Sequence, residues 1–297
     1  MLNMKNIIFG KKVNIKQFSC NTLDVPGVNI SPSANIFVKV TNGCNAKCKF
    51  CSNANTQVIS SNFDLQKFID IIEEFQNNDI KINKISITGG EPSLVPETVE
   101  RILKEFSKTE NKHIHLHLNT NGVLNQAKEL IQNPRWNSIS VSIHHYNFDI
   151  LSKIYGIPVF NKTYDYSNID KNKINISCNL IKGYIDSTEE VHKMLNFAID
   201  YGFPRIGFVS LMKINQYSED NYIDFDDISF ESIPNVYFTK SMNRGLDCKC
   251  SNYLYTRDLK ILEIYGRNYI NYNNSESSFV YNGQHLIQGF HDNNIIY

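Results

Sequence analysis

The sequence predicts an α/β protein built on a parallel sheet with helices outside it. From residue 35 onward, short β-branched runs alternate with amphipathic stretches, and each amphipathic stretch separates one run from the next. This alternation is typical of parallel sheets, either an open wound sheet or a partial barrel. After Met212 the alternation stops, and a β-hairpin is predicted over residues 252–269.

Each element follows from its own pattern. The predicted strands are rich in β-branched residues and span 35–40, 83–90, 113–122, 137–145, 173–183 and 205–212. The predicted helices repeat apolar residues at three- and four-residue intervals and span 62–76, 96–108, 125–132 and 188–202. Residues 146–171, which contain YGIP, are predicted to form a long irregular loop after the fourth strand.

Composition and charge narrow the function classes. Of the 297 residues, 41% are hydrophobic and 20% charged, as in globular proteins. Lys plus Arg and Asp plus Glu each number 30, so no net charge attracts nucleic acid or an anionic membrane. The sequence shows no apolar run of about 18 residues and no secretory signal at its start. We therefore expect a cytoplasmic protein with no membrane partner and no evident nucleic-acid partner, and a local charged patch is the alternative that neutrality leaves open.

Three of the seven cysteines, Cys44, Cys48 and Cys51, lie in one polar segment directly after the first predicted strand. In a reducing cytosol, clustered thiols are more often ligands than disulfides. Three interpretations compete. A structural zinc site normally needs four ligands, and no second CxxC pair follows nearby. An inert buried trio suits a polar loop poorly. The third is a [4Fe–4S] cluster held by three thiolates, with one iron open for an exogenous ligand.

A second motif favours the cluster. The sequence ITGGEPSL places Gly89, Gly90 and Glu91 at the end of the second predicted strand, one helix after the cysteines. Together, the CxxxCxxC spacing and the GGEP sequence resemble the radical S-adenosylmethionine (radical SAM) superfamily. The resemblance implies a [4Fe–4S] cluster on the three cysteines and S-adenosylmethionine (SAM) on its open iron.

The resemblance covers residues 35–212 and implies a partial (β/α)6 barrel similar to a TIM barrel. Residues 1–34 would then form an N-terminal extension. Residues 213–297 would form a C-terminal α+β or β-hairpin extension on the substrate side. In such barrels, functional groups lie at the C-terminal ends of the strands.

The resemblance also implies contacts with SAM. Phe50, the aromatic residue before the third cysteine, would lie near the adenine. Gly89, Gly90 and Glu91 would meet the methionine ammonium, and glycine suits this task because its backbone can approach a small ligand closely.

Alternation along the strands extends the list of candidates, because successive side chains point to opposite faces. In the fourth strand, the polar Ser142 and His144 should point into the lumen, and VSIH is similar to the family segment that meets the ribose or carboxylate of the nucleotide. An ordinary strand-end histidine is the alternative for His144. In the third strand, Asn119 resembles a position that contacts cofactor or substrate. Three further residues share its face: His113, His115 and His117.

These histidines are not expected to form a metal site. Alternate residues of one strand lie about 6.5–7 Å apart, which is too wide for compact chelation.

The implied activity is reductive cleavage of SAM to a 5′-deoxyadenosyl radical, which abstracts hydrogen from the substrate, with an electron donor such as flavodoxin or ferredoxin. Cys248 and Cys250 are candidate ligands of a second, auxiliary cluster, and two structural or free thiols are the alternative. This pair favours the tailoring of a ribosomally made peptide. The alternatives are a small-molecule substrate, such as a nucleoside or sugar, and a non-catalytic Fe–S binding or sensor protein.

Overall fold

The computed structural model describes residues 5–15, 33–52, 63–108, 111–166, 169–241, 251–267, 278–289 and 294–297. Six parallel strands form the centre of its main sheet. They are β3 (Ser33–Lys39), β4 (Lys81–Thr88), β5 (His115–Thr120), β6 (Ser138–Ser142), β7 (Ile174–Leu180) and β8 (Arg205–Ser210). They lie side by side in chain order, so the predicted parallel sheet is confirmed.

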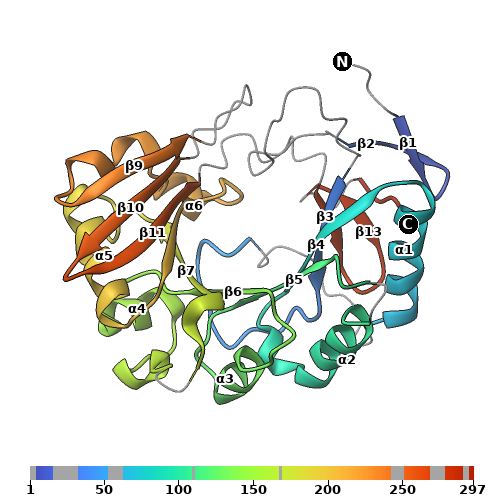
Figure 1. The fold of residues 1–297 in the computed structure, drawn as a ribbon, viewed down its shortest axis with the longest axis horizontal. Coiled ribbons are helices and arrows are strands. Elements are labelled where there is room, and N and C mark those ends of the chain that lie inside the picture. The colour runs from blue at the N-terminus through green and yellow to red at the C-terminus, as the bar shows by residue number, and fades with distance from the viewer. Residues whose placement is uncertain are drawn as a thin grey trace.

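One helix connects each of these strands to the next. The helices are α1 (Leu65–Asn77), α2 (Pro96–Phe106), α3 (Asn125–Ile131), α4 (Phe148–Tyr155) and α5 (Thr188–Asp200). Figure 1 shows the sheet as an open arc, with α2, α3 and α4 along its outer side. In the described part of the chain, no helix has the length and apolar character needed to cross a bilayer.

The prediction of an irregular loop over 146–171 is wrong, because α4 occupies part of it. Asn147 caps the start of α4, where its side chain accepts hydrogen bonds from the backbone N–H groups of Asp149 and Ile150. Gly156 ends the helix with φ +65°, a left-handed conformation that favours glycine. The glycine of YGIP is therefore a helix C-cap rather than a sign of irregular chain.

The chain after β8 extends the sheet at both ends. On the β8 side, the order continues with β11 (Lys260–Arg267), β10 (Ser251–Arg257) and β9 (Val236–Ser241). On the β3 side lie β12 (Ser278–Tyr281) and β13 (Leu286–Gln288). The predicted hairpin is formed by β10 and β11, which pair antiparallel. The chain also has a short helix, α6 (Gln216–Asp220), and a separate hairpin of β1 (Lys5–Ile8) and β2 (Lys11–Asn14).

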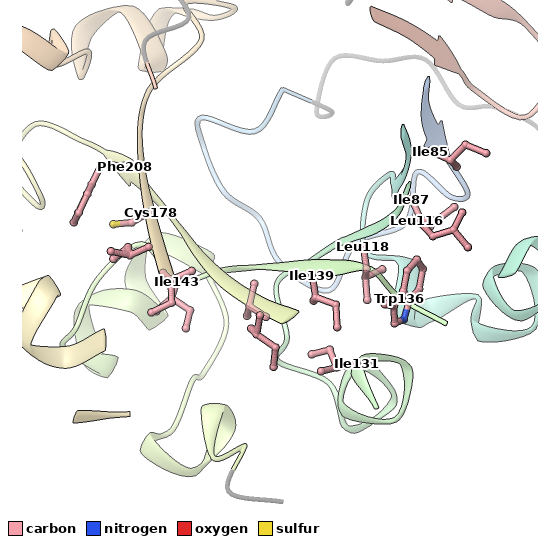
Figure 2. Close-up of a cluster of buried hydrophobic side chains, with 14 of the residues drawn as sticks. Ile85, Ile87, Leu116, Leu118, Ile131, Trp136, Ile139, Ile143, Cys178 and Phe208 are labelled. Carbon is pink, nitrogen blue, oxygen red and sulfur yellow. The ribbon is translucent and has the colours of Figure 1, made fainter. Parts of the chain in front are cut away.

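The core lies between the sheet and its outer helices. In β6, Ile139 and Val141 are almost fully buried, as the alternation predicts, whereas Ser140 is half-buried on the opposite, lumen face. Figure 2 shows side chains of neighbouring strands gathered on the helix side, where they meet Ile131 and Trp136. In β6, alternate residues therefore pack against the helices, and the others face the lumen.

Candidate cofactor site

The cysteine loop (residues 41–52) follows β3 and lies against the GGEP segment that follows β4. Two short backbone hydrogen bonds join them: Gly90 donates to the Thr41 carbonyl at 2.7 Å, and Glu91 donates to the Gly43 carbonyl at 2.8 Å. The two motifs that stand apart in the sequence thus meet at adjacent strand exits, as expected for the C-terminal edge of a parallel sheet.

The two glycines are required by this contact. A Cβ on Gly90 would lie 1.9 Å from the Gly43 carbonyl oxygen, which is far inside van der Waals contact. Gly89 has φ +139°, and its Cβ would lie 2.3 Å from the Thr41 carbonyl oxygen. The glycines therefore allow the close packing of two backbones, a role that the motif alone did not reveal.

Glu91 is buried and joins the exits of β4 and β5. It is 1% exposed, and its Oε1 accepts hydrogen bonds from the Ser93 backbone N–H (3.1 Å), the Ser93 hydroxyl (2.7 Å) and the Thr120 hydroxyl (2.7 Å). Its Oε2 accepts one from the Asn121 backbone N–H at 2.8 Å. The carboxylate thus positions the loops on which the candidate site is built.

Asn121, which was not among the predicted site residues, links this carboxylate to the thiols. Its Nδ2 donates to Asn45 Oδ1 at 2.8 Å and lies 3.9 Å from Cys44 Sγ. The Cys44 sulfur also accepts the Ala46 backbone N–H at 3.4 Å. Its role could have been inferred from NTNG, because Asn121 follows the candidate Asn119 by two residues, just beyond the end of β5.

The three thiols differ in exposure and disfavour one another's anionic forms. Cys44 is exposed, whereas Cys48 and Cys51 are half-buried. Burial, together with the nearby Cys51 and Cys44, raises the pKa of the Cys48 thiol to about 12. Although Cys44 is exposed as a residue, partial desolvation of its sulfur likewise raises the pKa of that thiol. A cationic centre would reverse this, because bound metal favours deprotonated thiolates.

These residues fit an iron–sulfur cluster better than a single ion. In the residues that the structure describes, no three His, Cys, Asp or Glu side chains converge as ligands of one metal ion. A cluster offers each thiolate a different iron, so its ligands need not meet at one point. Asn45 supports the same fit, because its Nδ2 is buried with no hydrogen-bond partner in the described ranges. A cluster sulfide would supply that acceptor.

The cysteine loop is held from two further elements. Lys47 donates its backbone N–H to the Tyr155 carbonyl at 2.7 Å, at the end of α4. Asn215, just before α6, donates its side-chain N–H to the Lys49 carbonyl at 3.1 Å. The Tyr155 hydroxyl in turn donates to the Ser142 carbonyl at the end of β6. The segment expected to be irregular therefore supports the loop.

Phe50 and His144, predicted separately, lie together. Their ring centroids are 5.1 Å apart in an edge-to-face arrangement, and Tyr155 also packs edge-to-face with His144 at 5.7 Å. His144 is 5% exposed, and burial lowers its pKa to about 3. Its Nδ1 accepts the Asn179 backbone N–H at 3.2 Å, so the neutral ring carries its proton on Nε2. His144 can therefore donate one hydrogen bond to a ligand.

The other candidates lie elsewhere. Asn119 lies on the lumen face of β5, where its Oδ1 is 3.3 Å from His117 Nε2 and its Nδ2 is 3.5 Å from the Ile87 carbonyl oxygen. Ser142 lies on the lumen face of β6. Cys248 and Cys250 fall outside the described residues.

Comparison with protein families identifies the class that this fold and site define. The model of the Radical SAM superfamily matches residues 38–226, which is more than half of the chain. The chain therefore belongs to the radical SAM superfamily, and the resemblance drawn from its two motifs is confirmed.

Curated relatives share a comparable stretch. The probable dual-specificity RNA methyltransferase RlmN of Fervidobacterium nodosum is 23% identical over 195 residues, which are 62% of this chain and 55% of that protein. The probable GTP 3′,8-cyclase of Saccharolobus islandicus is 26% identical over 187 residues, 61% of this chain and 58% of that protein. The chain thus spans a little over half the length of these relatives.

A solved structure shows the same fold. SuiB of Streptococcus suis, solved with bound S-adenosylmethionine, matches 64% of this chain and 43% of its own, with a TM-score of 0.51 at 20% identity. The partial-barrel fold class expected from the sequence is thereby confirmed.

Proposed function

We propose that this protein is an enzyme that binds a [4Fe–4S] cluster through Cys44, Cys48 and Cys51 and cleaves SAM reductively on it. The observation that carries the proposal is the contact between the cysteine loop and GGEP, which brings three thiols, a buried carboxylate and an unpartnered Asn45 amide to one sheet edge. When bound, the cluster and SAM supply a 5′-deoxyadenosyl radical that abstracts hydrogen from the substrate.

The residues around the loop would orient SAM. We assign the adenine to Phe50, whose ring packs against His144. The neutral His144 would donate its Nε2–H to the ribose or carboxylate, and Ser142 lies on the neighbouring lumen face. Asn119 is a further polar contact in the lumen.

The methionine ammonium would bind at GGEP. The Gly89 and Gly90 backbones and the Glu91 charge favour a cation there. Because Glu91 already accepts four hydrogen bonds, much of its effect would be exerted through the loops that it holds.

For the substrate, we propose a ribosomally made peptide, which the Cys248–Cys250 spacing supports because it suits an auxiliary cluster at the substrate side. A small molecule is the second candidate, supported by likeness to a probable GTP 3′,8-cyclase and by a polar lumen. We further propose a flavodoxin or ferredoxin as electron donor and a cytoplasmic location.

SAM cleavage without substrate tests the activity. The anaerobically reconstituted protein, given dithionite and SAM, should form 5′-deoxyadenosine, measured by liquid chromatography. The Cys44→Ala, Cys48→Ala, Cys51→Ala triple variant should form none. Cys178→Ala is the matched control, because that thiol is fully buried on the helix side of β7. Equal product from the triple variant would refute the proposal.

The auxiliary cluster has its own test. If Cys248 and Cys250 are ligands, replacing both by Ala should remove about four irons per chain while the first cluster remains. An iron content that stays at one cluster in both proteins would leave them as ordinary thiols and remove the support for a peptide substrate.

A further inference from the structure

The lumen face of the sheet is cationic although the chain is neutral overall. Strand alternation and register place five charged side chains among its described positions: Lys39, Lys84, Arg205, Glu263 and Arg267. Only one of these is acidic, and it is already paired, since Arg205 Nε lies 2.8 Å from Glu263 Oε2. An anionic group entering the lumen would therefore meet an excess of positive charge.

Lys84 is the lumen cation whose charge is least compensated. It is half-buried on β4, and within the described ranges it has neither a hydrogen-bond acceptor nor an acidic partner. Its side chain is half-buried rather than buried, so part of it is exposed. Burial lowers the pKa of Lys84, which shows that its charged form is disfavoured here. A counter-ion would remove that penalty.

A chain of hydrogen bonds fixes the tautomer of His115, the neighbour of Lys84 across the β4–β5 pairing. Asn119 donates its Nδ2 to the Ile87 carbonyl, so its Oδ1 must accept from His117 Nε2–H. His117 Nδ1 must then accept the Ser138 hydroxyl at 2.6 Å. Ser138 Oγ is left to accept His115 Nε2–H, also at 2.6 Å.

The chain therefore leaves His115 Nδ1 without a proton and without a partner in the described part of the chain. Among the described residues, Lys84 on β4 and His117 on β5 are the titratable groups that act on this ring, and Ser138 on β6 is uncharged. Burial lowers the pKa of His115, and the Lys84 charge lowers it further, so the ring is neutral near pH 7. An anion bound to Lys84 would reverse the second effect.

We infer that Lys84 and His115 together bind an oxyanion of the substrate, a carboxylate or a phosphate, at the base of the lumen. This deepens the proposed function and rests on it, since the substrate must enter the barrel. The ammonium would pair with the oxyanion, and His115 would take up a proton on Nδ1 and donate a second hydrogen bond. Lys84 precedes Gly89 by five residues, so the oxyanion would lie roughly 17 Å from the cofactor edge along the strand.

Anion titration tests the inference without any turnover. Inorganic phosphate or acetate is added to the oxidised, cluster-loaded protein at constant ionic strength, and histidine ring signals are followed by NMR. His115→Gln assigns the His115 signal. We expect a saturable shift of that signal, with tighter binding at about pH 6 than at about pH 8, because binding takes up a proton.

Variants identify the cation. Lys84→Met should weaken anion binding by about tenfold or more, since a charged hydrogen bond is lost. Lys84→Arg should retain binding. Lys81→Met and His113→Gln are matched controls, because both residues are exposed near the starts of the same strands, and neither should change the affinity. Thermal unfolding confirms that each variant is folded.

The titration distinguishes a phosphate from a carboxylate on the substrate. Preference for phosphate supports a phosphorylated substrate, and preference for acetate supports a carboxylate. No saturable shift with either anion, or unchanged binding by Lys84→Met, would overturn the inference. The titration needs neither reduced cluster nor SAM, so a failure to form 5′-deoxyadenosine would refute the proposed function without producing either of these results.

Discussion

Along β4 and β5, charged side chains differ in their hydrogen bonding between the C-terminal edge and the start of the strand pairing. At the C-terminal end, Glu91 is buried, and four hydrogen bonds from Ser93, Thr120 and Asn121 satisfy its carboxylate. Where the β4–β5 pairing starts, Lys84 is half-buried with no such partner in the described ranges. One charge is fully committed to the protein, and the other is left for a ligand.

This difference separates a charge that stabilises the structure of the site from a charge that is available to bind a ligand. A buried charge with complete hydrogen bonding fixes the backbone around it and is costly to remove. A half-buried charge without partners contributes little to folding, so its removal should leave the fold intact. The two ends of the same strands should therefore respond oppositely to substitution, in stability at one end and in ligand binding at the other.

The largest effect is expected at the cofactor end. Glu91→Ala removes the acceptor of four hydrogen bonds and leaves buried donors unpaired, so the free energy of unfolding should fall by about 3 kcal/mol or more. Urea unfolding measures this. Glu129→Ala, an exposed glutamate of α3, is the control and should change stability by less than about 0.5 kcal/mol. Similar midpoints for both variants would contradict the structural role of Glu91.

A second test uses acid. Burial lowers the pKa of both His117 and His144 to about 3, below the ordinary value of about 6.5. Between about pH 6.5 and pH 3, these two histidines therefore bind protons in the unfolded chain but stay neutral in the folded chain. Their stabilising effect is complete above about pH 6.5 and is lost as the pH falls toward 3, by up to about 1.4 kcal/mol per pH unit for each ring.

Urea unfolding across this pH range measures the slope, and His144→Gln should reduce it. The exposed His113, replaced by Gln, serves as the control and should leave the slope unchanged. An equal slope in wild type and in the His117→Gln, His144→Gln double variant would show that these rings do not titrate as described.

The smallest effect is expected at the support of the cysteine loop. Tyr155→Phe removes one hydroxyl, which donates to the Ser142 carbonyl, and should lower the free energy of unfolding by about 1 kcal/mol. Its backbone carbonyl still accepts from Lys47, so iron content should stay unchanged. Tyr237→Phe, at an exposed tyrosine of β9, is the control. Loss of iron in Tyr155→Phe alone would show that the ring, rather than the backbone, holds the loop.

The sequence predicted the parts of the fold that repeat. Alternation in the strand that holds Ile139 and Val141 identified the buried face because the period of a strand is two residues. The α4 helix was missed because its capping residues, Asn147 and Gly156, are also residues typical of loops. Local composition alone could not separate a helix cap from an irregular turn.

The site residues also fall into those that local sequence predicts and those that it does not. Cys44 and Gly90 were found because each belongs to a motif with fixed spacing. Asn121 was missed because its role depends on contacts with Glu91 and Asn45, which are distant in the sequence and are brought together by tertiary structure. The Lys84 environment also escaped the sequence analysis, since it depends on the register between β4 and β5, which is set by tertiary structure.

The most direct test of the central claim is the metal content of the cysteine loop. Anaerobically reconstituted protein in which Cys248 and Cys250 are replaced by Ala should contain about four irons and four sulfides per chain. Its reduced form should give a paramagnetic resonance spectrum that changes on adding SAM. Replacing Cys44, Cys48 and Cys51 by Ala as well should abolish both. Iron and a SAM-sensitive spectrum retained after that change would contradict the account.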